Sequence, residues 1–120
     1  MRDLARQLTA HPRWEWRVGM VTGDGVIARR MHDGSEVITG GSLDTWRDPA
    51  ALALDIHHPA TRGVLLAMLR EAHGDWVACY RIPHTQWAVV DCEMGETLAS
   101  GIDEGTALAA ALLRVWGVHE

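Results

Sequence analysis

The chain has 120 residues, the size of one ordinary domain, and 48% of them are hydrophobic while 22% are charged. The low proline content and the lack of any repeat or low-complexity run exclude a disordered or solenoid protein. The first ten residues carry arginine and aspartate rather than an apolar core, and no stretch approaches the roughly 18 apolar residues of a membrane span, so we expect one cytoplasmic domain over residues 1–120.

The formal net charge of −5 is unevenly distributed along the chain. Residues 1–31 carry six arginines and three acidic residues, whereas the remainder carries five arginines and thirteen acidic residues. Every cation is an arginine, which can hold a carboxylate or phosphate through two parallel hydrogen bonds. A duplex-binding domain is normally basic overall, so duplex nucleic acid is not an expected partner. A local site for an anion or an acidic partner stays open beside the simpler alternative, in which the arginines pair with nearby carboxylates.

A short helix and a first strand are predicted at the start of the chain. Leu4, Ala5 and Leu8 lie on one side of a helix, which must end before Pro12 because the residue ahead of a proline is pushed out of helical geometry. Apolar and charged residues then alternate with the period of two that is typical of a half-buried strand. The apolar members of this strand are Trp14, Trp16, Val18 and Met20.

Two turn signals predict that this strand continues into an antiparallel meander. Residues 23–25 read Gly-Asp-Gly and lead into an apolar run over 26–31, and residues 32–35 lead into a second run over 36–39. We therefore predict three antiparallel strands in the first third of the chain.

Residues 40–58 form the longest stretch without a regular pattern. Long connections in a compact domain are disproportionately functional, so Trp46 and Arg47 become candidate binding contacts together with Arg13 and Arg17. The alternative for Trp46 is that its indole folds back onto the core, since tryptophan is usually largely buried.

Asp55, His57 and His58 have the residue types of a metal site or an acid–base pair. Zinc sites normally show three or four ligands at recognisable spacings, and the sequence contains no HExxH motif and no pair of CxxC motifs. His58 directly precedes Pro59, where a polar side chain caps a following helix. Capping is therefore the favoured interpretation, with a metal site as the alternative.

The second half of the chain predicts a helix, a hairpin and a second helix. Apolar periodicity extends from Pro59 to His73, and an alanine-rich helix extends over residues 103–116. Between them, two strands alternate around a turn at residues 82–85, with Tyr80 expected opposite Trp87. Both faces of this hairpin are apolar, so we expect helices or a partner subunit to cover both.

The two cysteines are expected to be free and buried. In the register above, Cys79 lies opposite Ala88, and Cys92 is about four residues further along its strand. At about 3.3 Å per residue this offset is far beyond the reach of a disulfide.

Together these elements predict an α+β fold. We expect a layered sandwich with a mainly antiparallel sheet of about five strands, formed by the meander and the hairpin. An N-terminal, a central and a C-terminal helix pack against it.

The chain also resembles small uncharacterised proteins of tailed phages and prophages. The resemblance lies in residues 8–16 (LTAHPRWEW), 58–72 (HPATRGVLLAMLREA) and 103–113 (DEGTALAAALL), and the last two segments are similar to the phage ABA sandwich domain family. It implies a layered α/β sandwich, a phage origin and the cytoplasm of a host cell. The family commonly has Asp at the position of His58, which implies capping there, and it supplies no catalytic residue.

We therefore expect a non-enzymatic binding protein without a cofactor. Its partner would be a host or defence protein, or a small anionic or nucleotide-like ligand held by Arg13, Arg17, Trp46 and Arg47. One alternative is a small metal-dependent hydrolase that uses Asp55, His57 and His58. Another is a structural subunit whose apolar hairpin is covered by its own symmetry mate, and a homo-oligomer is expected in general.

Overall fold

A computed structural model describes residues 4–15, 17, 19–22, 25–30, 36–39, 44–47, 54–83 and 86–117, with the backbone alone over 25–47. The helices and strands follow in the order α1 (Leu4–Ala10), β1 (Val21–Thr22), β2 (Gly25–Arg30), β3 (Glu36–Thr39), β4 (Asp44–Arg47), α2 (Pro59–His73), β5 (Val77–Ile82), β6 (Gln86–Asp91), β7 (Glu96–Gly101) and α3 (Glu104–Val115).

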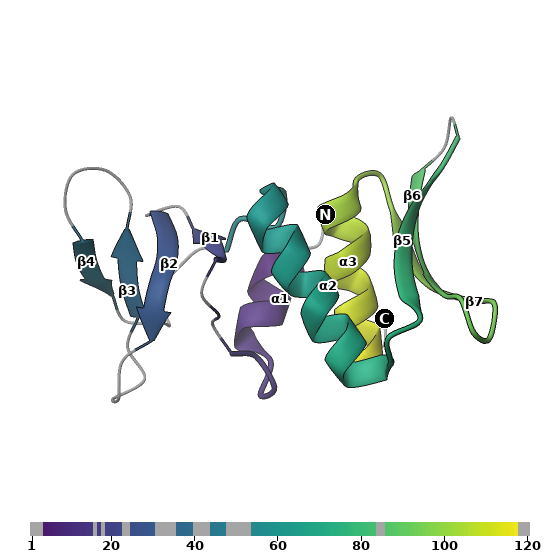
Figure 1. The fold of residues 1–120 in the computed structure, drawn as a ribbon, viewed down its shortest axis with the longest axis horizontal. Helices are drawn as coiled ribbons and strands as arrows, with labels where there is room; N and C mark the ends of the chain where they lie inside the picture. Colours follow the sequence, from purple (N-terminus) through teal and green to yellow (C-terminus); the bar gives the residue numbers. More distant parts are fainter. Residues whose placement is uncertain are drawn as a thin grey trace.

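The fold is an α+β sandwich, as the sequence predicted, but the meander and the hairpin belong to two separate sheets rather than one, and the helices form the middle layer (Figure 1). Figure 1 shows the sheet β1–β4 on one side of the three helices and the sheet β5–β7 on the other. Both sheets are antiparallel meanders in which the strands follow chain order. None of the helices in the described part of the chain is long and apolar enough to cross a membrane.

The core lies between the helices and the sheet β5–β7. The largest buried side chains come from α1, α2, α3 and the inner positions of β5 and β6, together with Met20 directly before β1. Small residues of α3 allow close packing, because a Cβ at Gly105 would collide with the carbonyl of Ile56. The core side chains with the least exposure include Leu8, Met20, Leu65, Leu69, Val77, Val89, Leu108 and Leu112.

The strand predicted over residues 13–20 was wrong. Trp14, Glu15, Arg17 and Met20 lie outside the strands, and β1 starts only at Val21. The segment turns instead, since Met20 N–H donates to the Arg17 carbonyl at 3.2 Å and Gly19 adopts a φ of 99°. Two of its apolar residues still pack inward, since Met20 is fully buried and Trp14 lies against the core. Trp16 and Val18 lie outside the described residues.

The meander itself is present but shifted toward the C-terminus. Strands β2 and β3 occupy the predicted segments. They pair from Val26 opposite Thr39 to Arg30 opposite Glu36, with a bulge between Ile27 and Arg29. The fourth strand, β4, falls within the stretch that was predicted to be irregular, and it pairs with β3 from Glu36 opposite Arg47 to Thr39 opposite Asp44.

Helix α2 has the predicted bounds, and its caps explain both ends. The His58 side chain accepts a hydrogen bond from the N–H of Ala60 at 3.1 Å, and Pro59 occupies the first turn where its missing N–H costs nothing. At the other end Gly74 has a φ of 134° and donates its N–H to the Arg70 carbonyl.

The C-terminal sheet has a third strand, β7, that the sequence analysis missed. Its pattern ETLASG has one large apolar residue, Leu98, so the period-two signal is weak. Asp91 forms the preceding turn, since its side chain accepts hydrogen bonds from the backbone N–H groups of Glu93 at 3.0 Å and Met94 at 3.2 Å. A bulge between Val89 and Val90 then shifts the pairing of β6 with β7.

The predicted register of the hairpin was wrong by one residue. The pairing extends to Ile82 opposite Gln86, so Tyr80 lies opposite Ala88 rather than Trp87, and Cys79 lies opposite Val89. A shift of one residue exchanges the two faces of one strand relative to its neighbour. Val77 and Val89 therefore share the face that packs on the helices, and both are buried.

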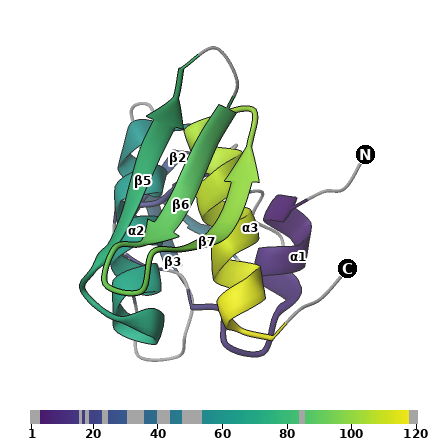
Figure 2. The same ribbon diagram turned by 90° about the vertical axis from the view of Figure 1, so that its right-hand side faces the viewer.

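Two further predictions about this sheet need correction. Both cysteines are free, as expected, but Cys92 is exposed and Cys79 is only partly buried. Among the described elements, helices also cover only one face of the sheet: in Figure 2 the strands β5, β6 and β7 lie in front of α2 and α3, and no described element lies in front of them. A partner subunit, the alternative cover for the other face, stays a prediction.

Candidate functional site

Arg17 is already engaged by carboxylates of the chain. Its guanidinium donates to both carboxylate oxygens of Glu71 on α2, through Nη1 and, at 3.1 Å, through Nη2, and its Nε donates to Glu15 at 2.9 Å. The hydrogen bond that Arg17 donates to Glu71 is the main reason that the pKa of Arg17 is raised above its ordinary value. The side chain therefore ties residues 15–17 to α2, and it has little capacity left for an external anion.

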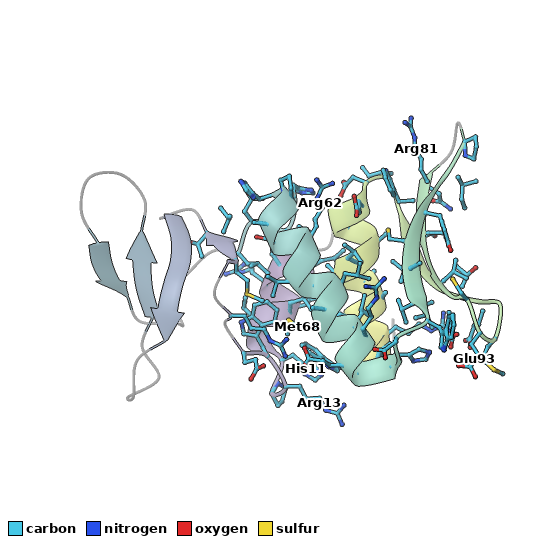
Figure 3. The ribbon with its side chains drawn as sticks, viewed as in Figure 1. His11, Arg13, Arg62, Met68, Arg81 and Glu93 are labelled. Carbon is cyan, nitrogen blue, oxygen red and sulfur yellow. The ribbon has the colours of Figure 1, made fainter. Side chains whose placement is uncertain are left out.

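Arg13 does not join Arg17 in a common site. Its backbone N–H donates to Nδ1 of His11 at 3.1 Å, which stabilises the turn after α1. The Arg13 side chain is exposed, and Figure 3 shows it extending away from the helices. The nearby His11 ring stacks on Trp116 with ring centroids 4.8 Å apart, so the loop is fixed against the end of α3.

Trp46 and Arg47 lie on β4 instead of an irregular loop. Their backbones pair opposite Val37 and Glu36 of β3. Only the backbone of these two residues is described, so the contacts expected of their side chains remain predictions.

Asp55, His57 and His58 each have a local structural partner. Asp55 accepts the N–H of His57 at 3.0 Å, His57 Nδ1 lies 3.2 Å from Asp103 of the α3 cap, and His58 caps α2. Within the described ranges no group of three His, Cys, Asp or Glu side chains is arranged to hold a metal ion. The arrangement therefore gives the metal-dependent hydrolase no support.

His73 and Asp91 form a second polar contact between a helix and the sheet. His73 Nε2 lies 2.8 Å from Oδ2 of Asp91, whose side chain is almost fully buried. The hydrogen bond with His73 is the main cause that lowers the pKa of Asp91, and the N–H groups of the following turn add to it. The contact joins the end of α2 to the β6–β7 turn, so it stabilises the packing of the helix on the sheet.

The uncovered face of the sheet β5–β7 is the main surface without a partner in the described structure. We call this surface the outer face. It comprises the residues whose register places them opposite to the buried Val77 and Val89. These are Trp76, Ala78, Tyr80, Ile82, Gln86, Ala88, Val90, Cys92, Thr97 and Ser100.

No residue of the outer face is charged, although 22% of the chain is. Its largest side chains are also open to solvent, since Trp76 is 65% exposed, Tyr80 52% and Ile82 41%. Contiguous exposed apolar surface of this kind marks a place where another molecule binds. Trp and Tyr are moreover the residues that contribute most binding energy in protein interfaces.

Neighbouring groups fix the side chain of Tyr80 and the backbone of Trp76 on this face. The hydroxyl of Tyr80 lies 3.2 Å from Sγ of Cys92, and the N–H of Cys92 donates to the carbonyl of Trp76 at 2.8 Å. Tyr80 thus lies within a paired strand and Trp76 directly before it, with its carbonyl hydrogen-bonded, so binding would require little loss of backbone entropy.

These apolar residues are evident in the sequence, but their pattern predicted a covered sheet. The decisive information is the one-residue register and the presence of β7, because together they place the polar Thr97 and Ser100 beside Val90 and Ala88 on the same face. A strand with polar residues at alternate positions is the signal that one face of this sheet meets solvent.

In comparisons with known proteins, the chain matched no family model, no curated protein and no solved structure.

Proposed function

We propose that this chain is a non-enzymatic binding protein and that its outer face docks onto a flat, apolar surface of a partner protein. The observation that carries the proposal is the uncharged outer face, with three large side chains between 41% and 65% exposed on one sheet. An uncharged patch on a chain of net charge −5 favours a partner with an apolar surface over a charged ligand.

The resemblance to phage proteins leads us to propose a protein of the bacterial host or of its defence systems as this partner. A small anionic ligand has less support, because Arg17 is occupied by Glu71 and Glu15. In the proposed complex, Trp76 and Tyr80 are the anchors and the small residues between them allow close approach.

The proposal is tested by quantitative capture of proteins from a bacterial host lysate with three tagged variants. We expect the wild type to retain a stoichiometric partner and Trp76→Glu to retain at least ten times less of it, since the change buries an unpaired charge in the interface. Ala67→Glu places the same charge at an exposed position of α2 and should retain the partner like the wild type. Equal capture by the wild type and Trp76→Glu, or no stoichiometric partner for the wild type, would contradict the proposal.

A further inference from the structure

The two edges of the sheet β5–β7 differ in how they are protected. At the β7 edge, Arg114 of α3 donates Nη1 to the carbonyls of Thr97 at 3.1 Å and Leu98 at 2.8 Å, while Glu96 accepts a hydrogen bond from its Nη2. A charged side chain that occupies edge carbonyls prevents another strand from pairing there. The β7 edge is therefore closed by the chain itself.

The β5 edge is closed only at its beginning. Trp76 and Cys92 form a hydrogen-bonded pair, and in an antiparallel ladder every second residue does so. The backbone N–H and C=O groups of Ala78, Tyr80 and Ile82 therefore point toward β6. Those of Val77, Cys79 and Arg81 point outward from the sheet edge. Of the outward carbonyls, that of Val77 accepts a hydrogen bond from Nε of Arg70 at 3.1 Å.

Cys79 and Arg81 are the remaining outward-facing residues of β5. No hydrogen bond to their backbone groups is found in the described part of the chain. Figure 2 shows β5 as the outermost strand of its sheet, with α2 behind it rather than beside it. Two open residues at a spacing of two are what an antiparallel strand needs for two adjacent hydrogen-bonded pairs.

We propose that β5 pairs antiparallel with β5 of a second copy of this chain, about a two-fold axis at Tyr80. Cys79 then faces Arg81 of the partner subunit, and Arg81 faces Cys79 of the partner subunit. Each of these two pairs exchanges two backbone hydrogen bonds. A two-fold arrangement uses the same surface on both copies, as most homodimers do.

The structure favours this register over its two neighbours. An axis at Cys79 would need the Val77 carbonyl, which Arg70 already occupies. An axis at Arg81 would place the two Arg81 side chains directly opposite each other, and like charges in that position are destabilising. The axis at Tyr80 avoids both conflicts.

An ion pair of the chain lies near the proposed contact. Glu104 and Arg62 form an ion pair at 3.0 Å, and both lie near enough to Cys79 to influence its thiol electrostatically. Cys79 and Arg81 share the helix side of β5, and Figure 3 shows Arg81 and Arg62 at the same end of the molecule. Arg81 of the partner subunit, lying opposite Cys79, would therefore lie near this ion pair.

The mass of the purified full chain in solution, measured by sedimentation equilibrium, tests the pairing. The wild type should rise with concentration from 13.2 kDa toward twice that mass. In Arg81→Pro the outward N–H is lost while the ladder to β6 is unaffected, so we expect dimerisation at least tenfold weaker. Arg81→Ala keeps the N–H and should dimerise more strongly than Arg81→Pro. A wild type that stays monomeric, or an Arg81→Pro variant that dimerises like the wild type, would overturn the proposal.

Disulfide trapping tests the register and does not depend on how well Arg81→Pro folds. In a chain with Cys79→Ser and Cys92→Ser, Tyr80→Cys should give a covalent dimer under mild oxidation, because residues at the axis face each other across a narrow pair. Ala78→Cys is the matched control and should give none, since its partner position is Ile82. Equal trapping at both positions would reject this register. Trp76 lies outside the open part of the β5 edge, so Trp76→Glu should still form the dimer. Loss of partner capture and loss of the dimer can therefore be distinguished.

Discussion

Among single residues, Asp91 has a side chain with three hydrogen-bond partners in the described structure. Its carboxylate joins α2, through His73, to the turn that starts β7, and it is 8% exposed. A buried carboxylate that is stabilised in its charged form by hydrogen bonds makes stability depend on pH.

The pKa of Asp91 is lowered in the folded protein, so its contribution is present above the unfolded value of about 3.9 and is lost as pH falls through the folded value. We therefore expect Asp91→Asn to lower the free energy of unfolding at pH 7, with a difference from the wild type that shrinks toward pH 3. Urea unfolding at both pH values measures this difference. Asp75→Asn, at an exposed position, is the control. A difference that does not change with pH would show that the charge of Asp91 is irrelevant.

The two thiols should differ strongly in reactivity. Burial raises the pKa of Cys79 to about 11, with the nearby Glu104 carboxylate adding to the effect, whereas Cys92 is exposed on the outer face. Since the thiolate is the reactive form, we expect Cys79→Ser to keep fast labelling by a thiol reagent at pH 8 and Cys92→Ser to be labelled at least ten times more slowly. Fast labelling of Cys92→Ser would mean that Cys79 opens to solvent.

At the scale of elements, glycines show where α3 packs closely and where α2 does not. A Cβ at Gly105 would collide with the Ile56 carbonyl, while one at Gly63 would meet nothing within 4 Å. Gly105→Ala should therefore destabilise the protein by about 1–3 kcal/mol through overpacking. Gly63→Ala should stabilise it by about 0.5–1 kcal/mol, because alanine has the higher helix propensity. Thermal or urea unfolding compares the two, and a stable Gly105→Ala variant would mean that α3 can shift away from residue 56.

The elements that the sequence predicted well are those with a strong local signal. Helix α2 was predicted with its observed bounds because periodicity, His58, Pro59 and Gly74 all act within a few residues. The errors fall where long-range packing overrides the pattern. Residues 13–20 alternate like a strand, yet the burial of Met20 against the helices requires a turn there.

At the scale of the whole molecule, the outer face and the β5 edge complement each other. With strands about 4.8 Å apart and about 3.3 Å per residue, three strands of six residues present roughly 300 Å² of flat sheet. A standard protein interface takes about 800 Å² from each partner. Pairing of two β5 strands would join two outer faces side by side and double the uncharged surface offered to a partner.

The candidate binding residues could be recognised from the sequence only in part. The apolar character of Trp76, Tyr80 and Ile82 was evident, whereas their exposure depended on a register and a third strand that no local pattern specifies. Arg17 was selected for its charge, and its pairing with Glu71 spans 54 positions of sequence. Such a contact becomes visible only when residues 15–17 and α2 are placed side by side.

The sequence alone determined the layered α+β class, the bounds of α2 and the free cysteines. These follow from periodicity, capping and spacing, which are local properties of the chain. The tertiary structure decided which face of the sheet β5–β7 is covered, which arginines are already paired and which sheet edge is open. These features depend on contacts between segments far apart in the chain, and a shift of one residue in pairing is enough to reverse a face.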